Sequence, residues 1–491
     1  MSGTSDQASW GELLSGRNGL RSLAVAGGVA LHAINVYIAV TILPSVVRDI
    51  GGLEYYAWNM TLFVAASIMS SALSAKANDV FGLKKAFLVA IAIFSVGTAT
   101  CALAPSMFWM LVGRTVQGAG GGLLLGLCYS SIRVVFEERL WPRAVGLTSS
   151  MWGVSTLSGP AIGGIFAQSG NWRWAYGAIL PVAFGLAWLV MTQINASTTG
   201  STNAPSQRIR VPVGKIALVV LSVLVVSMGS LSTHVGWNAL GVFVGLGIAA
   251  LVARSDMNAD IPLLPQGSYS LREAMGSIYA CVALISVSIT VEVFIPYFLQ
   301  VVHGYEPLAA GYLTALMSIG WTIGSIFSSS RQPATAKWLL RAGPATIAIS
   351  LAALAVLMPM LHLTQTYWLW VMLAPLFGVG LGIGISWPHL LSQVFRSAPA
   401  GQESIASGSV ITVQLFALAM GSTIAGMIVN AAGITDPGGV QGAQSAAYAL
   451  LFAFALAPGA AFFIIGRVIQ AKADTDAKAA AARAMAQEIT P

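Results

Sequence analysis

The sequence predicts an all-α integral membrane protein, and three observations support this fold class. First, 56% of the 491 residues are hydrophobic and only 8% are charged, whereas a soluble domain carries about 25% charged residues. Second, apolar runs of about 20 residues, the length that crosses a bilayer as a helix, recur along the whole chain. Third, Lys and Arg gather in every second connection between these runs.

Fourteen apolar runs are long enough to be membrane helices. They lie near residues 21–46, 56–75, 84–104, 107–132, 143–167, 174–193, 214–231, 237–253, 273–301, 308–328, 343–361, 367–394, 404–431 and 444–466. Because this number is even, both termini lie on one side of the membrane. We therefore expect a multi-pass protein with 14 transmembrane helices and both termini in the cytoplasm.

The distribution of basic residues predicts this orientation. With both termini inside, all of the 24 Lys and Arg residues except Arg48, Arg114 and Arg173 fall in cytoplasmic segments. Such a bias follows the positive-inside rule and indicates a cell inner (plasma) membrane. The net charge of +7 therefore reflects orientation. Since the basic residues are spread over many short loops, we expect no nucleic-acid partner.

Two polar linkers divide the chain. Residues 195–212 are rich in Ser, Thr, Asn and Pro, and residues 254–270 are charged and contain Pro. The expected parts are an N-terminal six-helix bundle (1–194), a linker with two inserted spans (195–271), a C-terminal six-helix bundle (272–470) and a cytoplasmic tail (471–491).

Two motifs lie in the first bundle and its loops. The run "GRTVQGAGGG" (113–122) places Arg114 and Gln117 ahead of several glycines. The loop "ALSAKANDVFGLKKA" (72–86) contains Asp79, Gly82 and Lys84 between the second and third expected spans. The glycines let another helix approach closely in lipid. A carboxylate at Asp79 is placed to pair with a basic residue such as Arg139, or to face a helix N-terminus, and so to hold the cytoplasmic side closed.

Three further motifs complete the pattern. The fifth expected span contains "GLTSSMWGVSTLSGPAIGG" (146–164), with its small and helix-loosening residues at Gly159, Pro160, Gly163 and Gly164. "NWRWAY" (171–176) opens the sixth span. "INVYIAVTILP" (34–44) lies in the first span.

Together these motifs resemble those of the major facilitator superfamily, and more closely its fourteen-span drug–proton antiporters. The resemblance implies a major facilitator fold of two six-helix bundles plus two inserted spans, with a site between the bundles. It implies a gating role for the loop around Asp79 and a hinge at Gly159 and Pro160. Asn35 stands where that antiporter family usually has Asp.

Arg114 and Glu292 are the charged residues that lie well inside spans. Arg114 is expected about 10 Å and Glu292 about 14 Å below the outer surface, with Asn35 at about 16 Å. His32 shares a helix face with Asn35. Because an intramembrane charge is costly, we expect Arg114 to act as a fixed charge in a central cavity and Glu292 as its protonatable partner from the second half. A purely structural carboxylate at Glu292 is the alternative.

These features favour proton-coupled efflux of small amphipathic or cationic compounds, as in multidrug resistance. An importer or facilitator of a small metabolite is the alternative, favoured by Asn35, and a polytopic membrane enzyme is a more distant one. No metal-ligand spacing and no nucleotide-binding motif occurs in the sequence. We therefore expect no cofactor, no metal site and no enzymatic activity, and a monomer whose partners are a small-molecule substrate, protons and the lipid bilayer.

Overall fold

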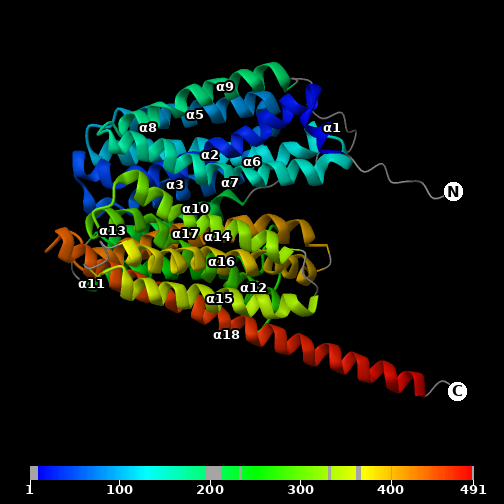
Figure 1. Ribbon diagram of the computed structural model, residues 1–491. Helices are drawn as coiled ribbons and strands as arrows, with labels where there is room; N and C mark the ends of the chain where they lie inside the picture. Colours follow the sequence, from blue (N-terminus) through cyan, green and yellow to red (C-terminus); the bar gives the residue numbers. More distant parts are fainter. Residues whose placement is uncertain are drawn as a thin grey trace.

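The computed structural model describes residues 9–194, 212–231, 235–329, 333–360, 366–399 and 401–488. Within these ranges helices and turns make up the chain, and no strand occurs (Figure 1). Ten helices in the described part are long and apolar enough to cross a membrane, or 11 if the pair Leu53–Ala72 and Ser74–Phe81, bent by 50°, counts as one span. The all-α membrane class is confirmed, whereas the expected count of 14 spans is not.

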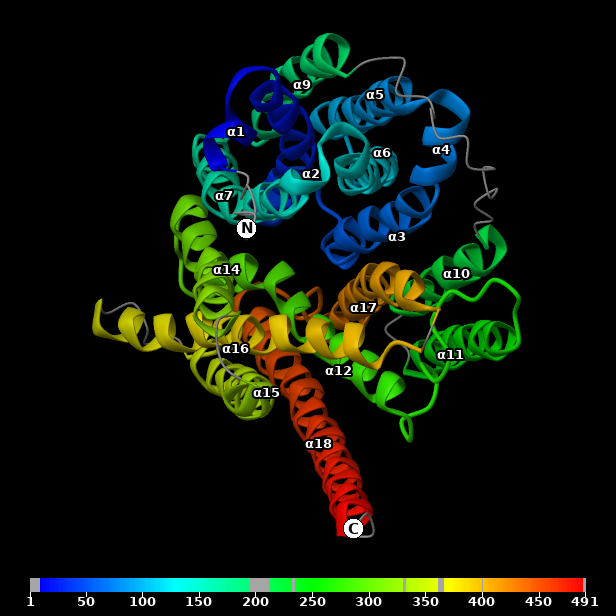
Figure 2. The same ribbon diagram turned by 90° about the vertical axis from the view of Figure 1, so that its right-hand side faces the viewer.

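The first helix group, α1–α9, lies at the top of Figure 2. Its elements are α1 (Trp10–Leu14), α2 (Gly16–Ile50), η1 (Leu53–Tyr55), α3 (Trp58–Ala72), α4 (Ser74–Phe81), α5 (Leu83–Ala102), α6 (Met107–Val135), η2 (Glu138–Leu140), α7 (Trp141–Gln168), α8 (Arg173–Gly177) and α9 (Ile179–Gln193). Helix α6 packs against α2, α3, α5 and α7. It therefore forms the centre of this group.

The second helix group, α12–α18, lies below the first in Figure 2. Its elements are α12 (Ala274–Ile289), η3 (Thr290–Val293), α13 (Ile295–Val301), α14 (Pro307–Ser329), α15 (Pro333–Leu357), α16 (Thr366–Ser397), α17 (Glu403–Ala431) and α18 (Gly439–Glu488). The inserted pair, α10 (Val213–Gly229) and α11 (Val235–Met257), lies beside the two groups, where α10 packs against both α3 and α17.

Glycines explain the close packing of α6. A Cβ atom at Gly118 would overlap the backbone of Phe63 in α3, and one at Gly120 would overlap the backbone of Phe94 in α5. In a membrane such small residues let backbones approach, since packing and hydrogen bonds replace the hydrophobic effect between helices. The glycine run in the sequence is therefore a packing face.

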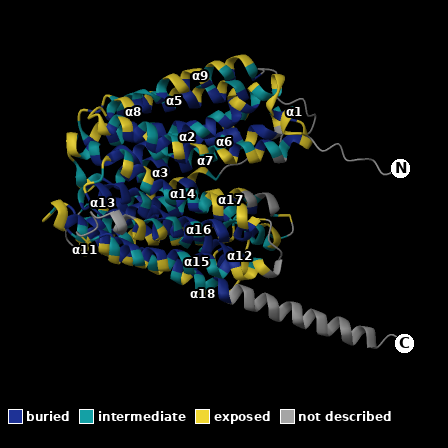
Figure 3. Cartoon of the chain, viewed as in Figure 1, coloured by how far each residue is buried: buried dark blue, intermediate teal, exposed yellow. Residues whose placement is uncertain are grey.

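The outward faces of the bundle are apolar. Figure 3 shows exposed residues along α9 and α11. They include Phe184 and Trp188 in α9 and Phe243 and Leu251 in α11, each more than half exposed. Exposed side chains of this kind suit contact with lipid tails, as a multi-pass membrane protein requires.

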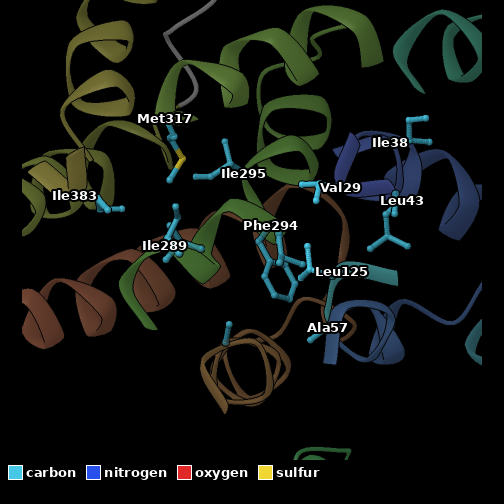
Figure 4. Close-up of a cluster of buried hydrophobic side chains, with 14 of the residues drawn as sticks. Val29, Ile38, Leu43, Ala57, Leu125, Ile289, Phe294, Ile295, Met317 and Ile383 are labelled. Carbon is cyan, nitrogen blue, oxygen red and sulfur yellow. The ribbon is translucent and has the colours of Figure 1, made fainter. Parts of the chain in front are cut away.

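Alternating helix directions give the bundle two ends. The Asp79 end holds the α4–α5 turn and the starts of α2 and α7, and the Asp49 end holds the α2–α3 turn and the start of α14. One buried apolar cluster contains residues of both groups, among them Ala57 of the first and Phe294 of the second (Figure 4). Both of these residues lie toward the Asp49 end.

Candidate functional site

Arg114 is buried in the first group, with 1% of its surface exposed. Its Nη1 donates to Oε1 of Gln117 at 2.7 Å, and its Nε donates to the carbonyl oxygen of Asn59 at 3.2 Å. The guanidinium carbon lies 4.2 Å from the centre of the Phe63 ring. Gln117 in turn donates from Nε2 to the hydroxyl of Thr98 at 2.8 Å. The charge is thus held by neutral acceptors and an aromatic ring that join α3, α5 and α6.

His32 and Asn35 lie on the buried side of α2. The ring of His32 lies 5.2 Å from that of Phe63 and 6.0 Å from that of Trp152, centre to centre. Asn35 is fully buried, and within the described residues neither atom of its amide group has a hydrogen-bond partner. A buried amide without partners is costly, so Asn35 is an unsatisfied polar group on this face of α2.

Glu292 lies where a membrane helix changes locally to 3-10 geometry. The short 3-10 segment η3 (Thr290–Val293) separates α12 from α13, and Glu292 is part of it. Within the part of the chain that the structure describes, Glu292 has no ion pair and no hydrogen bond. Its carboxylate interacts electrostatically with Tyr37 of α2, in the opposite group. A 3-10 stretch in the middle of a helix often marks a functional hinge.

The apolar parts of the helices around η3 provide no cation. α12, α13, α17 and α18 pack against it. Their sequences over 274–289, 295–301, 408–431 and 439–466 contain no charged residue. The titratable side chains in these ranges are Tyr279, Cys281, Tyr297 and Tyr448. Within these ranges, the carboxylate of Glu292 therefore has no counter-ion on the helices that pack against its segment.

Tyr37 connects the two groups at mid-depth, a role that sequence reasoning missed. Its hydroxyl is 3.1 Å from the hydroxyl of Ser318 in α14, a hydrogen bond between residues 281 positions apart. A contact over such a sequence separation leaves no periodic pattern, so only the three-dimensional structure reveals it.

The structure does not pair Arg114 with Glu292. The contacts of Arg114 lie in α3 and α6, whereas Glu292 lies beside α2 in the second group. Two polar centres result: a hydrogen-bonded cation inside the first group, and an unpaired carboxylate where the groups meet.

The loop around Asp79 differs from the expected latch. Asp79 is exposed and forms no ion pair with another described residue. Arg139, the partner that we expected, forms ion pairs with Glu12 of α1 and, at 2.8 Å, with Glu137. Gly82 has a φ of 73° and separates α4 from α5, a conformation that suits only glycine well. Lys84 donates to the carbonyl oxygen of Met191 in α9 at 2.5 Å.

The small residues of α7 face two different helices. A Cβ atom at Gly159 would overlap Tyr37 of α2, and one at Gly163 would lie 3.2 Å from the Ile38 carbonyl oxygen. Gly164 faces the second group, where an added Cβ would lie 2.5 Å from Cα of Leu308 in α14. Pro160 lies beside Gly311 of α14 in the same contact. These residues therefore bring α2, α7 and α14 together.

The "NWRWAY" motif ties α8 to the end of α2. Nη1 of Arg173 is 2.5 Å from Oδ2 of Asp49, and Nε1 of Trp172 donates to the same oxygen at 3.1 Å. Nη2 of Arg173 also donates to the carbonyl oxygen of Ala104 at 3.0 Å. The one arginine of this motif thus fixes the Asp49 end of the first group.

A buried carboxylate, Asp256, organises the linker after α11, and sequence reasoning missed it. Its oxygens accept from Nζ of Lys215 at 2.6 Å, from the hydroxyl of Tyr269 at 2.8 Å and from the backbone N–H groups of Leu263 and Leu264. Burial raises the pKa of Tyr269, and its hydrogen bond to the carboxylate raises that pKa further. The spacing of 41 residues between Lys215 and Asp256 hid this pair.

In the described ranges, no group of three or more His, Cys, Asp or Glu residues is arranged to hold a metal ion.

The chain matches the Major Facilitator Superfamily over residues 25–422. It is 34% identical over 433 residues to a protein of Mycobacterium tuberculosis named a probable multidrug-efflux transporter, an alignment that covers 87% of this chain and 91% of the relative. It is also 24% identical over 409 residues to multidrug resistance protein 3 of Bacillus subtilis, with 82% of this chain and 77% of that protein covered.

Solved structures show the same fold. A peptide transporter POT in complex with alafosfalin superposes with a TM-score of 0.66 at 16% identity, covering 94% of this chain and 96% of that one. An inward-facing, unoccupied bacterial homologue of the human lysosomal transporter Spinster has a TM-score of 0.59 at 18% identity, covering 92% and 97%. The expectation of a transporter that is not an enzyme is confirmed, and the chain belongs to the major facilitator superfamily.

Proposed function

We propose that this chain is a proton-coupled exporter of small amphipathic or cationic compounds. The observation that carries the proposal is Glu292, an intramembrane carboxylate on a 3-10 segment of a membrane helix. Among the described residues it forms no ion pair, and it interacts electrostatically with Tyr37 of the opposite helix group. A carboxylate in this setting is satisfied either by a proton or by a cationic ligand. The names of the multidrug-efflux relatives agree with this substrate class.

Exchange follows from competition for one group. When Glu292 binds a proton it is neutral, and the two helix groups can close over it without burying a charge. When it is ionised it attracts a cation from the open side of the cavity. Because proton and substrate exclude each other at this carboxylate, entry of one releases the other. The apolar and aromatic surroundings favour lipophilic cations over hydrated ones.

Arg114 has a supporting role in this proposal. Its charge is held inside the first group by Gln117, Asn59 and Phe63. His32 of α2 contacts the same Phe63 ring, so its side chain lies close to this cation. We infer that Arg114 sets the electrostatic potential around His32 and the unpaired amide of Asn35, and so disfavours a second proton at this place.

We further propose 14 spans. The two helices α6 and α7 have 29 and 28 residues, about 43 Å each, which is enough to cross a bilayer. Their glycines, Arg114 and hydroxyl side chains reduce their hydropathy but serve helix packing. Helix α10, with 17 residues, is short but apolar. The expected parts 1–194, 195–271, 272–470 and 471–491, the inner membrane, the cytoplasmic termini and the monomeric state belong to the same proposal.

We assign the described conformer to a state closed at the Asp49 end. The contacts that join the groups run from Tyr37 and Ser318 at mid-depth to Gly164 and Leu308 near that end. With cytoplasmic termini, this end is the outer one. Asp79, Gly82, Lys84 and Arg139 at the other end are then the cytoplasmic gate, where Arg139 and Glu12 come together in this state. Gly159, Pro160, Gly163 and Gly164 are the hinge on which α7 moves.

A facilitator that does not use protons is the second candidate. Asn35 favours it, because an amide cannot exchange a proton where related antiporters have a carboxylate. In that case Glu292 only binds the substrate, and a proton gradient has no effect on transport.

Reconstitution in liposomes separates the two candidates. Ethidium accumulation under an imposed pH gradient is measured for the wild type, for Glu292→Gln and for Glu306→Gln, an exposed glutamate in the next loop that serves as control. We expect uphill accumulation in the wild type and the control and its loss in Glu292→Gln. Proton-driven accumulation by Glu292→Gln at the wild-type level would overturn the coupling role, and a wild type indifferent to the gradient would favour the facilitator.

A further inference from the structure

The turn between α2 and α3 docks into the second helix group. The carbonyl oxygen of Glu54 accepts from Nδ2 of Asn430 at 3.1 Å, and that of Ala57 accepts from the hydroxyl of Ser422 at 3.2 Å. An added Cβ at Gly426 would lie 2.6 Å from Cβ of Ala57. Ser422, Gly426 and Asn430 are spaced by four residues and so lie on one face of α17. This face receives the turn.

Tyr56 is the side chain that this docked turn inserts. It is 1% exposed, and its ring stacks on that of Phe294 at 4.9 Å and meets that of Tyr297 edge-on at 5.5 Å, centre to centre. Both partners belong to the second group, while Tyr56 belongs to the first. Aromatic contacts of this kind stabilise an interface beyond the area that they bury. The ring therefore closes the Asp49 end between α17 and α13.

The hydroxyl of Tyr56 keeps the closure reversible. Within the described residues this buried hydroxyl has no hydrogen-bond partner. Gln300 of α13 likewise has both amide atoms buried and unpaired. A buried polar group without a partner destabilises the closed state, and it regains hydrogen bonds to water when the end opens. Closure thus combines favourable ring contacts with an unfavourable polar burial.

The two rings that contact Tyr56 belong to residues that follow η3 closely in the sequence. Phe294 follows the last residue of the 3-10 segment, and Tyr297 lies one turn further on in α13. Glu292 is two residues before Phe294. A 3-10 segment inside a helix is a common site of bending. A rotation at η3 that reorients Glu292 therefore also moves both rings that hold Tyr56.

We propose that Tyr56 is the gate residue of the Asp49 end, and that η3 links its seating to the occupancy of Glu292. The gate stands on the contacts of Tyr56 alone, whereas the link rests on the proposed coupling role of Glu292. Within 274–289, 295–301, 408–431 and 439–466, the titratable groups on the elements around η3 are Tyr279, Cys281, Tyr297 and Tyr448, and Tyr37 faces them from α2. Since none of them is cationic, occupancy of Glu292 by a proton or a cation is the variable that the gate senses.

Distances between spin labels at both ends test the gate. In a background without the native cysteines, one label pair replaces Arg48 and Gln441 at the Asp49 end, and another replaces Lys85 and Lys337 at the Asp79 end; all four side chains are exposed. Each pair is measured by pulsed electron resonance in the wild type, Tyr56→Ala and Tyr55→Ala. Tyr55 is the matched control, because its ring contact, with Trp58 at 6.5 Å, stays within the first group.

We expect Tyr56→Ala to raise the ratio of long to short distances at the Asp49 end by about tenfold, the effect of losing two aromatic pairs. The Asp79 end should close in parallel, and Tyr55→Ala should leave both distributions unchanged. Tyr56→Phe keeps the ring and removes only the unpaired hydroxyl, so it tests the gate in a variant that is expected to fold. It should increase the short-distance population at the Asp49 end and slow ethidium transport. Equal distributions for Tyr56→Ala and Tyr55→Ala, or a shift of Tyr56→Phe toward opening, would overturn the gate.

The link to Glu292 is read from the same labels. Adding ethidium should shift the Arg48–Gln441 pair in the wild type but leave Glu292→Gln unchanged. If Glu292→Gln shifts as the wild type does, the link is wrong while the gate can still stand. The coupling proposal fails separately, when Glu292→Gln still accumulates ethidium against its gradient under proton drive.

Discussion

Replacing Gln117 by Leu should destabilise the protein, and replacing the buried cation that it holds as well should recover part of the loss. Gln117→Leu keeps the side-chain volume but removes the acceptor that lies 2.7 Å from Nη1 of Arg114, so a charge stays buried with fewer partners. A hydrogen bond to a charged group contributes about 1.5–3 kcal/mol. Thr98 is little affected, because its hydroxyl still donates to the Phe94 carbonyl oxygen. The expected loss is therefore about 1.5–3 kcal/mol.

Arg114→Leu has two opposing effects. It removes two hydrogen bonds and the contact with Phe63, but it also removes a charge whose insertion into the membrane costs about 2.5–3.5 kcal/mol. The double variant Arg114→Leu/Gln117→Leu leaves no unpaired charge, so it should be more stable than Gln117→Leu alone. Thermal unfolding of the purified variants measures this order, with the exposed Thr115→Ala on the same helix as control. A double variant less stable than Gln117→Leu would refute the reasoning.

Three further predictions concern the loop, the linker and the topology. Gly82→Leu should lower both the unfolding temperature and the transport rate, because leucine does not tolerate a φ of 73°. Asp79→Asn changes an exposed side chain that has no ion pair among the described residues, so it should keep stability, and a loss of transport in this variant reports gating. Wild-type transport by both variants would exclude the gate role. Asp256→Asn should loosen the linker after α11 and increase proteolysis between residues 257 and 270 relative to Asp260→Asn, and equal cleavage would contradict the role of Asp256. For the topology, single cysteines replace Ser201 and Ser232, both outside the described residues. In intact cells an impermeant thiol reagent should label the cysteine at position 232 but not the one at position 201. The reverse result would exclude the 14-span topology.

Properties that depend on local composition could be predicted from the sequence. The apolar runs indicated the helices, because a bilayer fixes their length and polarity. The expected run 107–132 falls within α6, and 143–167 falls within α7. The glycines after Arg114 proved to be a packing face, because small residues have that effect wherever helices meet in lipid. Family membership followed from motifs of the same local kind.

Contacts between distant segments could not be predicted in this way. The partner of Tyr37 lies 281 residues away, and the pair of Lys215 and Asp256 is 41 residues apart. Charge alone suggested that Arg114 faces Glu292, but neutral acceptors within the same group satisfy the guanidinium. Likewise Asp79 and Arg139 share an end of the bundle, yet Glu12 lies nearer to the arginine. Depth and charge leave the direction of a side chain undetermined, and packing decides it.

Proton release on substrate binding tests the central claim most directly. In weakly buffered detergent solution, addition of tetraphenylphosphonium to the wild type should release protons, because the cation displaces them from Glu292. Glu292→Gln should release none, while Glu306→Gln, whose glutamate is exposed, should behave as the wild type. Release by Glu292→Gln equal to that of the wild type, or binding by the wild type without any release, would contradict competition between proton and cation at this carboxylate.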